Sequence, residues 1–151
     1  MGGDIMDTAS VRLATCGDYE EMARIVGEYP EDHPPDDDSR RYAGCQESQR
    51  IWWVAESEGV ILGLAMVTVD RSRLWVNALL VRSEYRNLGI GSMLMAWIED
   101  TAERLQLGHV VVPCLVRSES EAVLRKWHYE PNEAHMICSD GRAATLWLKW
   151  M

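Results

Sequence analysis

Residues 79–92 decide the fold, and they read Leu-Leu-Val-Arg-Ser-Glu-Tyr-Arg-Asn-Leu-Gly-Ile-Gly-Ser. The apolar start of this stretch predicts the end of a buried strand. From Ile90 to Leu105, apolar residues recur at helical spacing and predict an amphipathic helix. Gly89 and Gly91 stand where the loop enters that helix. The stretch therefore predicts a strand, a short loop and a helix N-terminus in direct succession.

This predicted helix N-terminus has the chemistry of an anion site, because the first N–H groups of a helix have no acceptor within it. Gly89 and Gly91 lack a Cβ, so a ligand can approach the backbone closely. The planar guanidinium of Arg86 suits a phosphate group. A dinucleotide fingerprint would require glycine where this chain has Leu94, and a P-loop would require Gly-Lys-Ser/Thr, which the stretch lacks. We therefore expect a phosphate site of another type.

The rest of the chain fits one α/β domain around this unit. Strands are predicted at residues 11–15, 51–56, 60–69, 74–81, 109–116, 134–138 and 143–150, and helices at 18–29, 39–49 and 90–105, with a short one ending at Trp127. Asp18 is the predicted N-cap of the first helix, with Glu21 completing a capping box, and Gly108 is the predicted C′ residue of the long one. This order predicts an α/β fold in which helices flank a central mixed sheet of six or seven strands. We expect a flexible N-terminus over residues 1–9 and a single domain over residues 10–151.

Composition argues against several classes of protein. With 24 acidic and 15 basic residues, the chain has a formal net charge of −9, which repels nucleic-acid backbones and suits a cationic partner. Its apolar runs fall short of the roughly 18 residues of a membrane span, and its start lacks the basic and apolar regions of a secretory signal. The four cysteines form no Cys-x-x-Cys pair, so neither a zinc site nor a redox motif is indicated. We expect a cytoplasmic protein that binds neither nucleic acid nor a membrane.

Residues 85–91, Tyr-Arg-Asn-Leu-Gly-Ile-Gly, resemble the R-x-x-G-x-G signature of the GNAT superfamily of N-acetyltransferases. The element order resembles that family over nearly the whole chain, while the match is residue-specific over 79–92 and, weakly, over 127–131. The resemblance implies a GNAT-like fold with acetyl-CoA as co-substrate. It also implies that the strand end holds the pantetheine arm and the turn holds the diphosphate. The cofactor-binding residues it implies are Leu79, Leu80, Val81, Arg86, Asn87, Leu88, Gly89, Ile90, Gly91 and Ser92.

Several positions depart from the family's pattern. Leu88 stands where a basic residue is common, which removes one phosphate contact, and Asn87 and His128 stand where glycine is common. Asn77 matches the strand glutamate that often serves as the general base; it cannot take a proton, but it can orient a water or a substrate carbonyl. Leu124 matches the tyrosine that often serves as the general acid. The loss of the acid is tolerable, because a thiolate leaving group with a pKa of roughly 8.5 departs without much proton help.

A base is nevertheless required, because a primary amine with a pKa of about 10.4 arrives protonated and cannot attack a thioester. The resemblance places the loop after the first helix at the acceptor site. It therefore makes Tyr29, His33 and Asp36 the candidate substrate residues. The replacement bases that the sequence leaves open are His33, Asp36, Asp37, His109 and Glu133.

Three functions follow as alternatives. The favoured one is transfer of an acetyl group from acetyl-CoA to a primary amine of a small cationic molecule, by direct attack in a ternary complex. The first alternative is acetyl transfer to protein N-termini or lysines, which shares the cofactor site but needs an open peptide groove. The second is a non-catalytic module that senses acetyl-CoA, which Asn77 and Leu124 motivate. The expected partner is a small-molecule amine, and a homodimer is left open.

Overall fold

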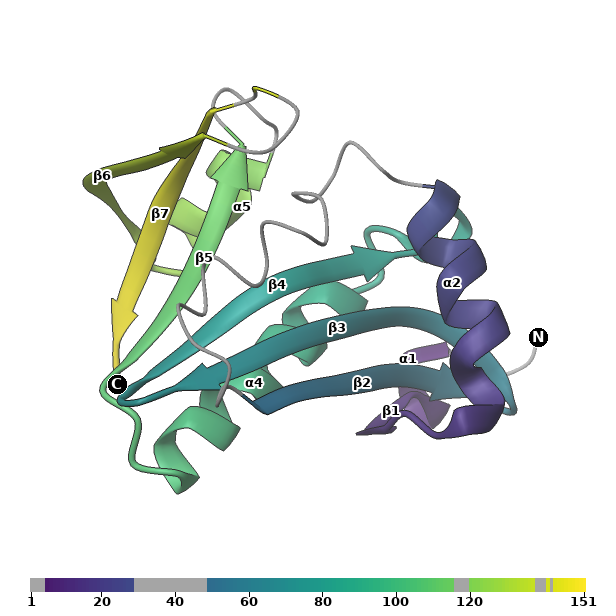
Figure 1. Cartoon of the computed structure of the whole chain (residues 1–151). Coiled ribbons are helices and arrows are strands. Elements are labelled where there is room, and N and C mark those ends of the chain that lie inside the picture. The colour runs from purple at the N-terminus through teal and green to yellow at the C-terminus, as the bar shows by residue number, and fades with distance from the viewer. Residues whose placement is uncertain (1–4, 29–48, 116–119, 138–140, 142) are drawn as a thin grey trace.

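A computed structural model describes residues 5–28, 49–115, 120–137, 141 and 143–151 (Figure 1). The described chain forms one seven-stranded sheet in the order β1-β2-β3-β4-β5-β7-β6, with helices on both faces. The strands are β1 (Ser10–Leu13), β2 (Gln49–Ser57), β3 (Val60–Asp70), β4 (Arg73–Val81), β5 (His109–Leu115), β6 (Glu130–Ile137) and β7 (Ala143–Trp150). The helices are α1 (Ile5–Thr8), α2 (Tyr19–Glu28), α4 (Ile90–Arg104) and α5 (Ser120–Lys126), with short 3-10 turns at Cys16–Asp18 and Ser83–Tyr85. The predicted mixed sheet is confirmed.

Strands β4 and β5 form the parallel pair of the sheet, and the other neighbouring strands are antiparallel. The parallel pair joins Arg73 with His109, Leu74 with Val110 and Trp75 with Val111. Beyond these pairs the two strands diverge, as Figure 1 shows. From residue 76 to residue 81, the edge of β4 that faces β5 therefore has no strand partner within the described chain.

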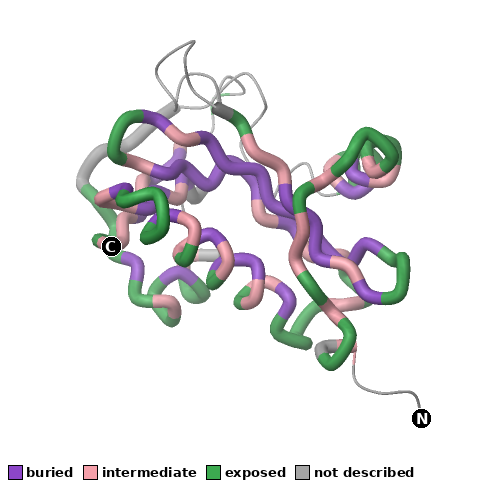
Figure 2. The backbone as a smooth tube through the Cα atoms, turned by 90° about the horizontal axis from the view of Figure 1, so that it is seen from below, coloured by how far each residue is buried: buried purple, intermediate pink, exposed green. Residues whose placement is uncertain are grey.

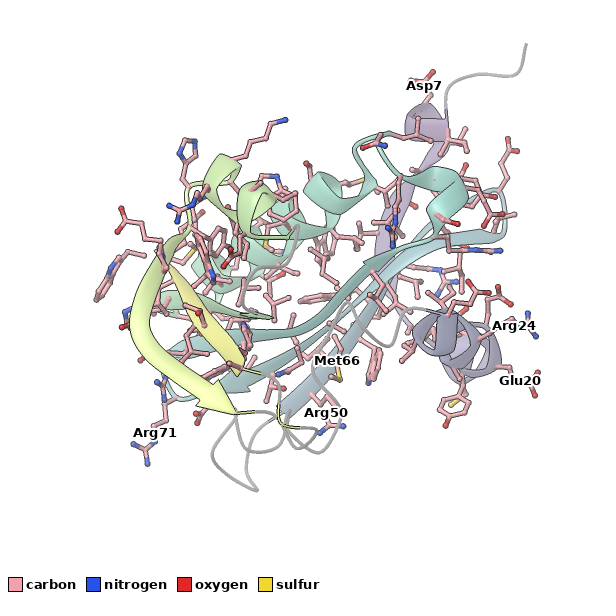
Figure 3. All side chains as sticks on the ribbon, turned by 90° about the horizontal axis from the view of Figure 1, so that it is seen from above. Asp7, Glu20, Arg24, Arg50, Met66 and Arg71 are labelled. Carbon is pink, nitrogen blue, oxygen red and sulfur yellow. The ribbon has the colours of Figure 1, made fainter. Side chains whose placement is uncertain are left out.

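Two helices cover opposite faces of the central strands. Apolar residues of α4, such as Leu94 and Ile98, pack on one face of β3 and β4, and Met22 and Ile25 of α2 pack on the other. Figure 3 shows the two helices on either side of the sheet, with Met66 of β3 on the α2 side. Because both faces are covered, β3 is buried almost throughout, as its continuous apolar sequence predicted (Figure 2).

The predicted cap of α2 is wrong by three residues. Thr15, not Asp18, is the N-cap of the 3-10 turn that leads into α2, and Asp18 completes the capping box by accepting the Thr15 N–H at 2.7 Å. The Asp18 carboxylate also accepts two hydrogen bonds from Arg12 on β1, at 2.8 and 3.0 Å. Glu21 pairs instead with Arg24 and Arg82. Asp18 rather than Glu21 therefore completes the capping box, because Glu21 is engaged in ion pairs with Arg24 and Arg82.

The predicted end of α4 is also wrong. Gln106, with φ at 58°, is the left-handed residue after the helix, and the Leu107 N–H returns to the Ala102 carbonyl at 2.9 Å. Gly108 instead donates its N–H to the Ser72 carbonyl at 2.7 Å and leads into β5. Gly108 thus links the loop after α4 to the turn between β3 and β4, and it does not cap the helix.

The remaining differences concern the ends of the chain's elements. Strand β6 begins at Glu130, four residues before its predicted start. Of the helix predicted over 39–49, residues 39–48 lie outside the described part, and residue 49 begins β2. Residues 5–8 form α1 inside the stretch 1–9, whose flexibility stays a prediction. Among the helices in the described ranges, none is long and apolar enough to cross a membrane.

Candidate active site

The predicted strand, loop and helix are present in the turn that follows β4. Strand β4 ends at Val81, the turn Ser83–Tyr85 follows, and α4 begins at Ile90. Two residues of this loop have left-handed backbone conformations: Asn87 with φ at 65° and Gly89 with φ at 94°. Asparagine and glycine are the residues that best tolerate this region, so the local sequence suits the turn.

The start of α4 offers a row of hydrogen-bond donors. The first helical bond runs from the Met93 N–H to the Gly89 carbonyl at 3.0 Å. Within the described chain, the N–H groups at positions 89–92 therefore have no acceptor. The Arg86 Nε donates to the Val81 carbonyl at 3.1 Å, which ties this exposed guanidinium to the end of β4. Donors gathered at a helix start suit an anionic ligand such as a diphosphate.

Gly91 is a glycine that the fold itself does not require. Its φ is not positive, unlike that of Gly89. A Cβ built on Gly91 would lie 3.8 Å from Trp127 and 3.8 Å from Val81, which is ordinary van der Waals contact. A tight turn thus explains Gly89 but not Gly91, where the lack of a Cβ leaves the backbone open to close approach.

Asn77 is a buried hydrogen-bond donor without a partner. The pairing between β3 and β4 shifts at this point, because Met66 faces Ala78 and Val67 faces Val76, so Asn77 is the extra residue of a β-bulge. Thr68 donates its hydroxyl to Asn77 Oδ1. Asn77 is 3% exposed, and its Nδ2 has no acceptor within the described chain. A buried amide of this kind is stabilised when a ligand or a water supplies an acceptor.

This donor lies close to the place where the sheet opens. Asn77 comes two residues after Trp75, the last β4 residue that pairs with β5. It therefore lies on the part of β4 whose outer edge has no strand partner, four residues before Val81 and the turn. Leu80 and Val81, whose backbone the resemblance assigns to the pantetheine arm, and Leu79, a further predicted cofactor residue, lie on the same part of β4. The structure thus places Asn77 and the three cofactor residues predicted at positions 79–81 on the same end of β4.

A charged pocket of about 380 Å³ lies beside this region, lined by Arg12, Gly17, Asp18, Glu21, Gly59, Val60, Ile61 and Arg82. Its charges are paired. Arg12 binds both Asp18 and Glu56, and Arg82 contacts Glu21 at 3.3 Å. The hydrogen bond from Arg12, with a further one from the Thr15 N–H, lowers the pKa of the Asp18 carboxyl well below its usual range. Arg82, the first residue after β4, is held by Glu21 and by a hydrogen bond from its Nη1 to the Ile61 carbonyl at 3.4 Å.

Several predicted site residues lie elsewhere. Tyr29, His33, Asp36 and Asp37 fall outside the described residues, as does the side chain of Glu133. His109 begins β5 opposite Arg73, four residues from Asn77 along β4, which is roughly 13 Å at the usual rise of a strand. Its ring packs 3.9 Å from that of Trp150. His109 thus lies at the end of the sheet away from the turn.

Two further residues bear on the site. Leu124, at the position matching the general acid, is 3% exposed and packs in the core beneath α4, so an apolar residue fills that place. Sequence reasoning missed Trp127, whose indole Nε1 donates to Ser92 Oγ at 3.2 Å. The two residues are 35 positions apart, so the spacing of nearby residues could not predict this contact.

The sequence and the fold both have known counterparts. The model of the Acetyltransferase (GNAT) family matches residues 19–141. A search of curated proteins gave no significant match. Among solved structures, Ard1 from Thermoplasma volcanium superposes with a TM-score of 0.77 at 16% identity, covering 95% of this chain and 98% of its own.

Two further structures have the same fold. They are yncA from Salmonella typhimurium, solved with acetyl-CoA (TM-score 0.73, 15% identity, 95% and 94% of the two chains), and the ribosomal-protein-S18-alanine N-acetyltransferase from Escherichia coli (TM-score 0.70, 12% identity, 94% and 93%). The family match confirms the resemblance stated from residues 85–91 and, with it, acetyl-CoA as the co-substrate. An unpartnered edge on β4, free amide donors on α4 and a matching family model together lead to one conclusion: this chain belongs to the GNAT family of acetyltransferases.

Proposed function

We propose that this protein transfers the acetyl group of acetyl-CoA to a primary amine of a small cationic molecule, by direct attack in a ternary complex. The observation that carries the proposal is the first turn of α4, where N–H groups without an acceptor adjoin a glycine that the fold does not need. Those donors would hold the diphosphate, with Arg86 beside them. The net charge of −9 favours a cationic acceptor over an anionic one.

The edge of β4 supports the same assignment for the pantetheine arm. From residue 76 to 81, backbone groups on one side of the strand have no strand partner in the described chain. The amides of a pantetheine arm can pair with such an edge as an added strand would. Acetyl-CoA then supplies an acyl group on a thiolate leaving group. Leu79, Leu80 and Val81 are the residues that would align it.

Asn77 is assigned a positioning role. Its Oδ1 is occupied by the Thr68 hydroxyl, so the amide presents Nδ2 as a donor. Such a donor can hold a water or a carbonyl oxygen, but it cannot remove the proton of an ammonium group. The base is therefore assigned to the acceptor side, where Tyr29, His33 and Asp36 remain the proposed substrate residues.

The test is an assay of CoA release with a thiol-reactive dye. The enzyme and acetyl-CoA are mixed with a panel holding a polyamine, an aminoglycoside, an amino-acid amide and a peptide with a free N-terminus. We expect release above the hydrolysis blank with a cationic small molecule, and intersecting initial-velocity lines for the two substrates. Release with the peptide alone would move the assignment to protein N-termini. No release with any amine would refute transfer.

Arg86 provides the matching test of the cofactor site. Arg86→Ala should weaken acetyl-CoA binding by roughly 1.5 to 3 kcal/mol, which is about 10- to 150-fold in Kd by calorimetry. Arg104→Ala is the control, because Arg104 is exposed at the far end of α4 and pairs with Asp100. Equal affinity of the Arg86 variant and the wild type would contradict the diphosphate assignment.

A second candidate, a sensor of acetyl-CoA without turnover, is favoured by Asn77 in the bulge and by the buried Leu124. It predicts tight acetyl-CoA binding together with no transfer to any member of the panel. The calorimetric and dye measurements above therefore separate the two candidates with one protein sample.

A further inference from the structure

The side chain of Trp127 lies against the first turn of α4. Its indole Nε1 donates to the Oγ of Ser92, the third residue of that helix, at 3.2 Å. Its ring carbon Cη2 lies 3.8 Å from the place that a Cβ on Gly91 would occupy. Trp127 thus hydrogen-bonds to Ser92 and lies beside Gly91, two of the four positions, 89–92, whose N–H groups are assigned to the diphosphate.

The hydrogen bond determines how the Ser92 hydroxyl can act. A serine oxygen that accepts a bond from the indole N–H must direct its own hydrogen elsewhere. A helical serine or threonine often donates to a carbonyl one turn back, as Thr101 does to the Trp97 carbonyl at 2.9 Å. Ser92 makes no such bond within the described chain. Its hydroxyl therefore stands as a further donor beside the row of N–H groups.

A second set of contacts holds the backbone of Trp127. Lys149 of β7 donates from Nζ to the Trp127 carbonyl at 3.2 Å and to Glu99 Oε1 at 3.1 Å. Tyr129 donates its hydroxyl to Glu99 Oε2 at 2.9 Å. Burial, together with the charge of Glu99, raises the pKa of Tyr129 above its usual range, so this hydroxyl stays protonated and keeps donating.

These contacts connect Trp127 to two positions of α4, Ser92 directly and Glu99 through Lys149. Ser92 and Glu99 are seven residues apart, which is two turns of a helix, so they lie on one side of α4. The indole is held at Ser92 in the first turn of α4. The backbone carbonyl of Trp127 is held two turns later, through Lys149 and Glu99. A ring held in this way loses little further entropy when a ligand arrives, which is the condition for a preorganised donor.

We propose that Trp127 is a positioning residue for the diphosphate of acetyl-CoA: its indole N–H holds Ser92 Oγ so that the Ser92 hydroxyl donates to a phosphate oxygen. The inference rests on the proposed function and goes beyond it, because it assigns a role to a residue outside the 79–92 stretch. Trp127 itself makes no bond to the phosphate; it acts through Ser92. Its effect should therefore depend on the presence of the phosphate groups.

The test compares Trp127→Phe, Ser92→Ala and the double variant. Phenylalanine keeps an aromatic side chain and removes the indole N–H, together with the outer part of the indole whose Cη2 lies nearest Gly91. The control is Trp150→Phe, because Trp150 is 74% exposed and pairs with His109 at the opposite end of β4 from the turn. Thermal unfolding first establishes that each variant is folded. Calorimetry then gives Kd for acetyl-CoA and for S-acetyl-pantetheine, which has the same thioester but no phosphate.

We expect Trp127→Phe to raise the Kd for acetyl-CoA by roughly 3- to 10-fold and to leave that for S-acetyl-pantetheine unchanged. Ser92→Ala should lose at least as much, and the double variant should lose no more than Ser92→Ala alone, because the two residues act as one unit. In turnover, KM for acetyl-CoA should rise while kcat and KM for the amine stay constant.

Two results would overturn this inference without affecting the proposed function. One is equal affinity of Trp127→Phe and the wild type for acetyl-CoA. The other is an equal loss of affinity for acetyl-CoA and for S-acetyl-pantetheine, which would mark a merely structural role. Additive losses in the double variant would likewise separate Trp127 from Ser92 and overturn it. Failure of the wild type to bind acetyl-CoA would instead refute the proposed function together with this inference.

Discussion

Replacing Gly63 with alanine should destabilise the strand end that carries the site. A Cβ on Gly63 would lie 2.6 Å from the Leu80 carbonyl oxygen and 3.3 Å from Val81 Cα, both of them backbone atoms of β4. Ordinary contact begins at 3.4 Å, so the two strands would have to separate by about 0.8 Å. Both strands are held in register on either side, since Leu64 pairs with Leu80 and Gly63 with Val81.

The expected cost follows from this clash. Overpacking of a close-packed region costs about 1 to 3 kcal/mol. The neighbouring hydrogen bond from the Arg82 N–H to the Leu62 carbonyl, 2.9 Å long, would stretch as β4 moves, at a further cost of about 1 kcal/mol. The alanine offsets about 0.4 to 1 kcal/mol by restricting the unfolded chain. We therefore expect the free energy of unfolding to fall by roughly 2 kcal/mol.

Urea denaturation measures this change. With a slope of about 2 kcal/mol per molar, the midpoint should fall by about 1 M while the slope stays constant. Gly27→Ala is the matched control, because a Cβ there meets nothing within 4 Å in helix α2. That variant should gain up to about 0.5 to 1 kcal/mol. If Gly63→Ala were as stable as Gly27→Ala, the close approach of β3 to β4 would not be what requires glycine.

Two further changes test the backbone and charges around the site. His128 has φ at 69°, in the left-handed region, so His128→Gly should raise the free energy of unfolding by up to about 1 kcal/mol in urea denaturation; a loss would show that the imidazole contributes contacts. The pKa of Asp18 is lowered in the folded chain by Arg12, so its contribution is complete above the unfolded pKa of about 3.9 and is lost as the pH falls further. Asp18→Asn should thus be less stable than the wild type at pH 7, and the difference should shrink by pH 2; a constant difference would contradict the ion pair as its cause.

The sequence was most informative where one local pattern decided the outcome. The apolar run of β3 predicted burial on both faces, and the spacing of Ile90, Leu94 and Ile98 predicted the buried side of α4. The glycine-rich turn also needed only its own residues, because Asn87 and Gly89 carry the left-handed conformations themselves. These features are set by steric preference and by periodicity, which act over a few residues.

The errors arose where distant residues decide the outcome. The choice of Thr15 as N-cap depends on Arg12, which Glu56 of β2 helps to hold across 44 positions of sequence. The bulge at Asn77 depends on the register of β3, and no single-strand pattern marks it. The role of Trp127 depends on a contact with Ser92, 35 residues earlier.

The short parallel join between β4 and β5 has a consequence for how the chain folds. Strands β1–β4 and strands β5, β7 and β6 are each assembled from antiparallel neighbours, whereas the join consists of three residue pairs and first closes between Arg73 and His109, 36 positions apart. Closing that loop costs more chain entropy than forming the hairpins β2–β3, β3–β4 and β6–β7, whose strands follow one another in the sequence. We expect these hairpins to form first and the seam between β4 and β5 to close after them, with α4, which lies between Val81 and His109 in the sequence, connecting the two strands.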